Sequence, residues 1–101
     1  MLENQLIEFL NCALGKPPKQ HNKFINEARR LFAKVIRNEE SGTIINNLIE
    51  NPDNYVSTWV CAWVLDDGIV AHKDHAIEKL KLLYKTDSNI KYIFQNHGIE
   101  V

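Results

Sequence analysis

The most constraining feature of this sequence is a row of apolar residues whose spacing matches the turn of an α-helix. The row lies within residues 19–37 and consists of Phe24, Ala28, Leu31, Phe32, Val35 and Ile36. Steps of four, three and one residues place these side chains on one face of a helix. The pattern therefore predicts an amphipathic helix of up to about 20 residues, roughly 30 Å long.

Shorter rows with the same spacing occur along the rest of the chain. They lie at residues 2–13, 44–49, 76–84 and 90–94. Helix start and stop signals separate them: Gly15 and two prolines follow the first row, Asp74 precedes the row at 76–84, and Gly98 follows the last. Because short loops make successive helices antiparallel neighbours, we expect an all-α fold of about six helices stacked as antiparallel α-hairpins.

The tryptophan-containing segment fits two different structures. As a helix, it places Trp59 and Trp63 on one side, and the preceding Asn51-Pro52-Asp53 supplies an Asn cap, a proline at the first helical position and an early acidic residue. As strands, its β-branched residues alternate, and Asp67-Gly68 would turn a hairpin. We favour the helix, and the alternative is an α+β fold with a hairpin at 55–71.

Length and composition bound the class of protein. A chain of 101 residues with 45% hydrophobic and 25% charged residues predicts a single helical domain, residues 1–101, and excludes disordered and low-complexity classes. The longest apolar run, residues 59–65, is far shorter than the roughly 20 residues of a membrane span. The N-terminus lacks the features of a secretory signal, and two scattered cysteines make no disulfide framework. We therefore expect a cytoplasmic protein that uses no cofactor.

Charge is divided sharply along the chain. Residues 16–37 hold seven Lys or Arg against one Glu, whereas residues 38–72 hold six Asp or Glu and no Lys or Arg. The charges of the two segments, +6 and -6, cancel, and the remaining residues leave the chain with a net charge of -1. Such a division can steer an oppositely charged partner or pair two parts of the same chain.

Five of the basic residues form a ridge on the predicted helix at 19–37. They follow one another at steps of four, seven, four and three residues: Lys19, Lys23, Arg30, Lys34 and Arg37. On a helix these positions lie away from the apolar row. A basic ridge can contact a phosphate backbone, but the pI of about 6.4 and the lack of interleaved aromatic residues favour an acidic protein partner or a merely solvated face.

Three further residues are candidates for contact with a partner. Asp66 and Asp67 are adjacent carboxylates in the acidic segment, and Trp59 could anchor an interface if one side of its helix is exposed. Packing into the core is the simpler use for Trp59 and Trp63.

The sequence His72-Lys73-Asp74-His75 is the only segment with the spacing of a metal site. On a helix His72 and His75 share a face, so that two imidazoles with Asp67 could hold a divalent metal, or could do acid–base chemistry. The simpler interpretation is a polar loop that leads into a helix. We expect no metal and no catalytic activity, because no second ligand pair, Gly-rich phosphate loop or nucleophile motif is present.

The second half of the chain resembles a known class of helical repeat. Residues 51–62, Asn-Pro-Asp-Asn-Tyr-Val-Ser-Thr-Trp-Val-Cys-Ala, look like a HEAT-type repeat, in which a Pro-Asp turn leads into a helix that opens with Val and a small-residue pair. HEAT repeats usually carry an Arg one or two places after that Val, where this chain has Ser57 and Thr58. Over roughly residues 44–98 the chain is similar to short bacterial HEAT-like proteins of unknown function. The resemblance implies stacked α-hairpins that bind other macromolecules, and no catalytic residue.

These observations predict a non-catalytic helical protein-binding module that acts through a charge-polarised surface. By analogy with small bacterial domains of this composition, an immunity or inhibitor protein is the expected type. The alternative is a nucleic-acid-binding domain that uses the basic face of residues 19–37.

Overall fold

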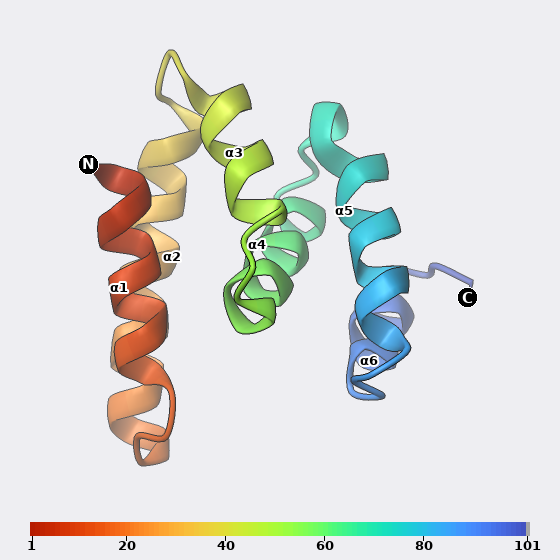
Figure 1. The fold of residues 1–101 in the computed structure, drawn as a ribbon, viewed down its shortest axis with the longest axis horizontal. Helices are drawn as coiled ribbons and strands as arrows, with labels where there is room; N and C mark the ends of the chain where they lie inside the picture. Colours follow the sequence, from red (N-terminus) through yellow and green to blue (C-terminus); the bar gives the residue numbers. More distant parts are fainter. Residues whose placement is uncertain (101) are drawn as a thin grey trace. The chain divides into compact units, whose positions relative to one another are not determined.

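The computed structural model describes residues 1–100, and six α-helices form in this part of the chain (Figure 1). They are α1 (Leu2–Ala13), α2 (Pro18–Ile36), α3 (Ser41–Ile49), α4 (Asn54–Asp66), α5 (Val70–Tyr84) and α6 (Ile90–Asn96). The described residues contain no strand. The predicted all-α class is therefore confirmed, and the alternative hairpin at 55–71 is wrong.

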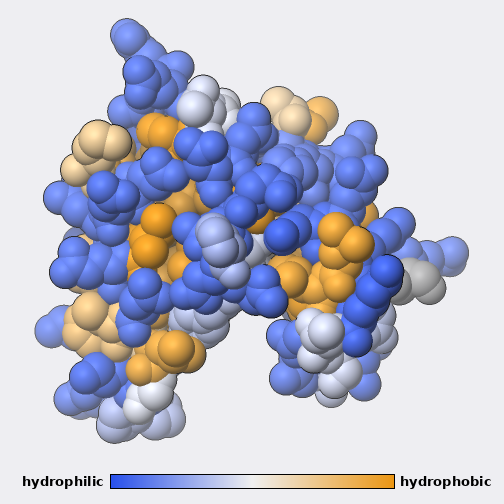
Figure 2. Space-filling model, in the orientation of Figure 1, coloured by the Kyte–Doolittle hydropathy of each residue, from blue (hydrophilic) through white to orange (hydrophobic). Residues whose placement is uncertain are grey.

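Contacts within the chain group it into two units. Unit 1 spans Met1–Asn47, and unit 2 begins at Leu48, so that α3 runs from one into the other. Hydrophilic residues cover most of the visible face of each unit, and hydrophobic residues form separate patches on it (Figure 2). No helix among residues 1–100 combines the length and the apolar character needed to cross a membrane.

In unit 1, α1 and α2 pack side by side as an antiparallel hairpin (Figure 1). The turn between them passes through Gly15, whose φ of 78° lies in the left-handed region that favours glycine. Pro18 then opens α2, where its missing N–H costs nothing. The rings of Phe9 and Phe24 meet across the pair with their centroids 6.4 Å apart.

The buried face of α2 shares three residues with the predicted row of six, whose members Phe24 and Leu31 are only half-buried. Its buried residues are Ile25, Ala28, Phe32 and Val35. Ile36, which the row included, is an exposed residue, whereas Ile25, which it omitted, is buried. The buried face is therefore centred slightly to one side of the predicted row.

In unit 2, α4 is buried on most of its circumference. Seven of its thirteen residues are buried: Val56, Ser57, Val60, Cys61, Trp63, Val64 and Leu65.

The N-cap of α4 differs from the predicted one. Asp53, not Asn51, is the N-cap, and its side chain accepts a hydrogen bond from the Tyr55 N–H at 3.0 Å. The Asn51 side chain instead accepts from the Asp53 N–H at 2.8 Å, which shapes the turn before the helix.

The helix α5 packs on α4 after a turn through Gly68, whose φ is 62°. It begins at Val70, so that Asp74 lies inside the helix and does not mark its start as the sequence had indicated. The last helix, α6, contacts the end of α5 through Tyr84 and Phe94, whose ring centroids are 5.9 Å apart. The α4–α5 pair and α6 thus form a second set of packed helices, as the predicted α-hairpins require.

Candidate partner-binding surface

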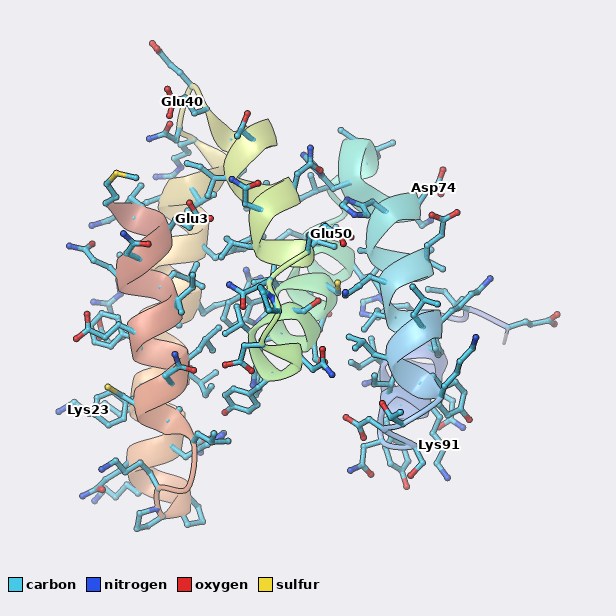
Figure 3. All side chains as sticks on the ribbon, viewed as in Figure 1. Glu3, Lys23, Glu40, Glu50, Asp74 and Lys91 are labelled. Atoms are coloured by element: carbon cyan, nitrogen blue, oxygen red, sulfur yellow. The ribbon has the colours of Figure 1, made fainter. Side chains whose placement is uncertain are left out.

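The five basic residues of the predicted ridge are all exposed on one side of α2 and its C-cap. This surface, hereafter the basic face, consists of Lys19, Lys23, Arg30, Lys34 and Arg37. At 100° per residue they fall within a narrow arc, opposite the arc of the buried residues. Figure 3 shows the labelled Lys23 side chain directed outward from the α1–α2 pair. The packing of α1 against α2 therefore fixes which way the basic face points.

The basic face is long and straight. Eighteen helical steps separate Lys19 from Arg37, which corresponds to about 27 Å along the axis. Arg30 forms an ion pair with Glu27 at 3.5 Å, but the Arg30 side chain is 70% exposed, so that water screens this pair. The face consequently retains most of its positive charge for an incoming partner.

Few other chemical groups lie between the five basic residues. Asn26 and Ala33, which share their side of the helix, are both exposed and small. Arg29 lies outside the arc, with its guanidinium carbon 5.7 Å from the ring centroid of Phe32. A surface of this kind offers charge and hydrogen-bond donors but no aromatic platform for a stacked base.

The other three candidate residues belong to unit 2 and occupy two places on or just after α4. Trp59 is half-buried near the middle of the helix, where its ring lies 6.4 Å from that of Tyr55 and 5.8 Å from that of Trp63. Asp66 and Asp67 are exposed at its C-terminal end. The structure thus brings the five basic residues together on one surface, whereas it separates Trp59 from the two aspartates by about 10 Å of helix.

Asp66 also has a structural partner that the sequence did not reveal. The Nε2 atom of His97 lies 2.8 Å from Asp66 Oδ1, which links the end of α6 to the end of α4. The two residues are 31 positions apart, and no spacing rule connects them. Part of the hydrogen-bonding capacity of Asp66 is therefore used within unit 2.

The weak metal candidates His72, His75 and Asp67 do not form a metal site. No group of three or more metal-binding side chains comes together among residues 1–100. His75 instead meets Glu50, with its Nε2 atom 2.7 Å from Glu50 Oε1. That hydrogen bond is the main reason why the pKa of Glu50 is lowered, and burial followed by the charge of His75 lowers the pKa of His72. The two histidines therefore differ in their contacts: both are half-buried, and His75 bridges to Glu50, the residue that follows α3.

The two cysteines lie in opposite environments. Cys12 is exposed on α1, and Cys61 is buried in α4. Burial raises the pKa of the Cys61 thiol to about 12. Because the thiolate is the reactive form, Cys61 packs as a small apolar residue at neutral pH.

Comparison with known proteins adds no identification to this geometry. The chain matches no family model, no curated protein and no solved structure.

Proposed function

We propose that this chain is a non-catalytic helical module that binds an acidic protein through the basic face of α2. The observation that carries the proposal is that all five basic side chains are exposed on one side of a helix whose other side is held in the core. An inhibitor or immunity protein, which masks a partner by binding it, is the type of protein that we propose. Charge complementarity of this kind mainly raises the association rate and selects the partner.

The composition of the surface favours a protein over a nucleic acid. Unit 1 carries seven Lys or Arg against five Asp or Glu, and unit 2 carries five against eight. The whole chain is thus slightly negative, which would oppose a long polyphosphate but not a compact acidic patch. The basic face also lacks aromatic residues for base stacking.

Nucleic-acid binding is the second candidate, and the length of the basic face supports it. Five exposed cations over about 27 Å could each approach a phosphate, because neighbouring phosphates lie several ångströms apart along a strand. This candidate predicts binding without strong sequence preference.

We also propose that residues 44–98 are a HEAT-like arrangement. The α4–α5 hairpin and the turn at residues 51–53 support this proposal. A HEAT-like fold would agree with a binding function, since such helical pairs present extended faces to partners.

Affinity capture with a matched pair of variants tests the proposed function. The first variant, Lys23→Glu/Arg30→Glu/Lys34→Glu, reverses three charges of the basic face. The control, Lys81→Glu/Lys85→Glu, reverses two exposed lysines of unit 2. The wild type, the basic-face variant and the control are immobilised as three baits and incubated with extract from cells that express the chain. Binding of duplex DNA and of single-stranded RNA to each bait is tested separately at about 50 mM salt.

The proposal expects a specific acidic protein that the wild type and the control retain and that the basic-face variant loses. Retention of DNA or RNA by the wild type, lost in the same variant, would instead establish the second candidate. Both candidates are contradicted if the three baits capture the same molecules equally, or if the basic-face variant still captures every molecule that the wild type captures.

A further inference from the structure

A cavity in unit 2 has the chemistry of a binding site for a cationic group. Its volume is about 490 Å³, within the range of small-ligand sites. The first turns of α4, the end of α5 and the loop before α6 line it, through Asn54, Tyr55, Thr58, Trp59, Leu83, Thr86, Asp87 and Asn89. This cavity is distinct from the basic face, which lies on unit 1.

Two hydroxyl groups at the wall can only accept hydrogen bonds from a ligand. Thr58 donates its single hydroxyl proton to the Asn54 carbonyl at 2.7 Å, and Thr86 donates its own to the Leu83 carbonyl at 3.2 Å. A hydroxyl oxygen has one proton and two lone pairs, so each of these oxygens still offers acceptor capacity. The two threonine hydroxyl groups therefore offer acceptors, and no proton, to a ligand.

Asp87 adds the only formal charge to the lining. One carboxylate oxygen accepts from the Asn89 N–H at 3.0 Å, which fixes the side chain in the loop. A carboxylate has about four lone-pair sites, so this bond leaves several for a ligand. No Lys, Arg or His lines the cavity, and thus no cation of the lining competes for this carboxylate.

Aromatic rings provide the remaining contact surface. Tyr55 and Trp59 meet edge to face, with an interplanar angle of 83°. Trp59 and Thr58 also line a second cavity of about 200 Å³, completed by Ala62 and Ile93. The faces of such rings attract cations, and the second cavity offers space for an apolar group next to them.

We propose that this cavity binds a guanidinium or ammonium group carried on an aliphatic chain. The charged head donates hydrogen bonds to Asp87 and to the Thr58 and Thr86 hydroxyl oxygens, while the aliphatic stem lies against Trp59. Two sources share this chemistry: a free alkylamine, and an arginine or lysine side chain of a peptide. The proposal does not depend on the function of the basic face.

A titration with three probes tests the site and separates the two sources. The probes are agmatine, a blocked Arg-Leu dipeptide, and the corresponding citrulline-Leu dipeptide, which has the same shape without the charge. The readout is the NMR signal of the Trp59 indole N–H, with that of the 3% exposed Trp63 as an internal reference. The variant is Asp87→Asn, which keeps an acceptor for the Asn89 N–H, and the control is Asp74→Asn, which removes a carboxylate of α5 outside the cavity.

The proposal expects a saturable shift of the Trp59 signal with a cationic probe, and binding about tenfold weaker for the citrulline dipeptide and for Asp87→Asn. Asp74→Asn should bind as the wild type does. Tight binding of agmatine identifies a free amine as the ligand, and binding of the Arg-Leu dipeptide alone identifies a peptide side chain. Equal affinity for the arginine and citrulline dipeptides, an unchanged affinity in Asp87→Asn, or no shift at about 10 mM probe overturns the proposal.

Discussion

The hydroxyl group of Ser57 donates a hydrogen bond of 2.6 Å to the carbonyl oxygen of Ile49. Ser57 is completely buried and is the one polar residue in that state among residues 1–100. The bond joins the second turn of α4 to the last residue of α3, across eight positions of sequence. It thereby satisfies a backbone oxygen at a helix end, where no intrahelical partner exists.

Removal of this hydroxyl should destabilise the protein. Ser57→Ala leaves the Ile49 carbonyl without its donor in a buried place, and we expect a loss of about 1–3 kcal/mol in the free energy of unfolding, measured by chemical denaturation. Thr58→Ala is the matched control, because the Thr58 hydroxyl bonds a carbonyl of its own helix. The control should change stability by less than about 0.5 kcal/mol. Equal losses in the two variants would contradict this role of Ser57.

The N-cap of α4 gives a second stability prediction. Asp53→Ala removes the acceptor for the Tyr55 N–H, and we expect a loss of about 1 kcal/mol. Asp53→Asn keeps a side-chain oxygen at the same place and should lose only a few tenths of a kcal/mol. If both variants unfold at the same denaturant concentration as the wild type, Asp53 does not cap the helix.

The thiol groups should differ in reactivity. With a pKa of about 12, about one Cys61 thiol in 10,000 is ionised at pH 8. We therefore expect a thiol reagent to modify only Cys12 in the folded protein and both cysteines after denaturation. A Cys12→Ser variant is the control, and it should react only when unfolded. Comparable reaction rates for the two folded thiols would show that α4 is not packed as described.

The contact between His75 and Glu50 has a defined dependence on pH. It lowers the pKa of Glu50 below its ordinary value of 4.5, so the folded state binds this proton more weakly than the unfolded state does. The resulting stabilisation is present above pH 4.5 and is lost as the pH falls through the lowered pKa. NMR titration of the Glu50 carboxyl carbon should show its pKa rising toward 4.5 in His75→Ala and unchanged in His72→Ala. A Glu50 pKa that is the same in wild type and His75→Ala would refute the contact.

Much of the fold could be predicted because local patterns specify helices. The apolar rows and the stop signals at Gly15 and Gly98 predicted the six helices that the structure contains. The helix at Trp59 and Trp63 competed with an interpretation as strands, since β-branched residues also suit strands. Its cap and its burial on most of its circumference decide for the helix, because burial of an apolar helix outweighs the intrinsic preference of its residues.

The basic face could also be predicted, since it requires only the regular spacing of residues along α2. The cap at Asp53, the start of α5 at Val70 and the hydrogen bonds of His75, His97 and Ser57 could not. The three hydrogen bonds depend on which segments meet in space, because their partners lie between 8 and 31 residues apart. The cavity beside Asp87 was missed for the same reason, because its lining comes from three separate segments of unit 2.

The association rate of the captured acidic partner, measured by stopped flow at increasing salt, tests the central claim most directly. If the basic face steers the partner, the wild-type rate should fall steeply between about 50 and 200 mM salt, and Lys23→Glu/Arg30→Glu/Lys34→Glu should associate on the order of tenfold more slowly at the low end. The Lys81→Glu/Lys85→Glu control should follow the wild type. A wild-type rate that does not change with salt, or equal rates for the wild type and the basic-face variant, would contradict the claim that α2 is the binding surface.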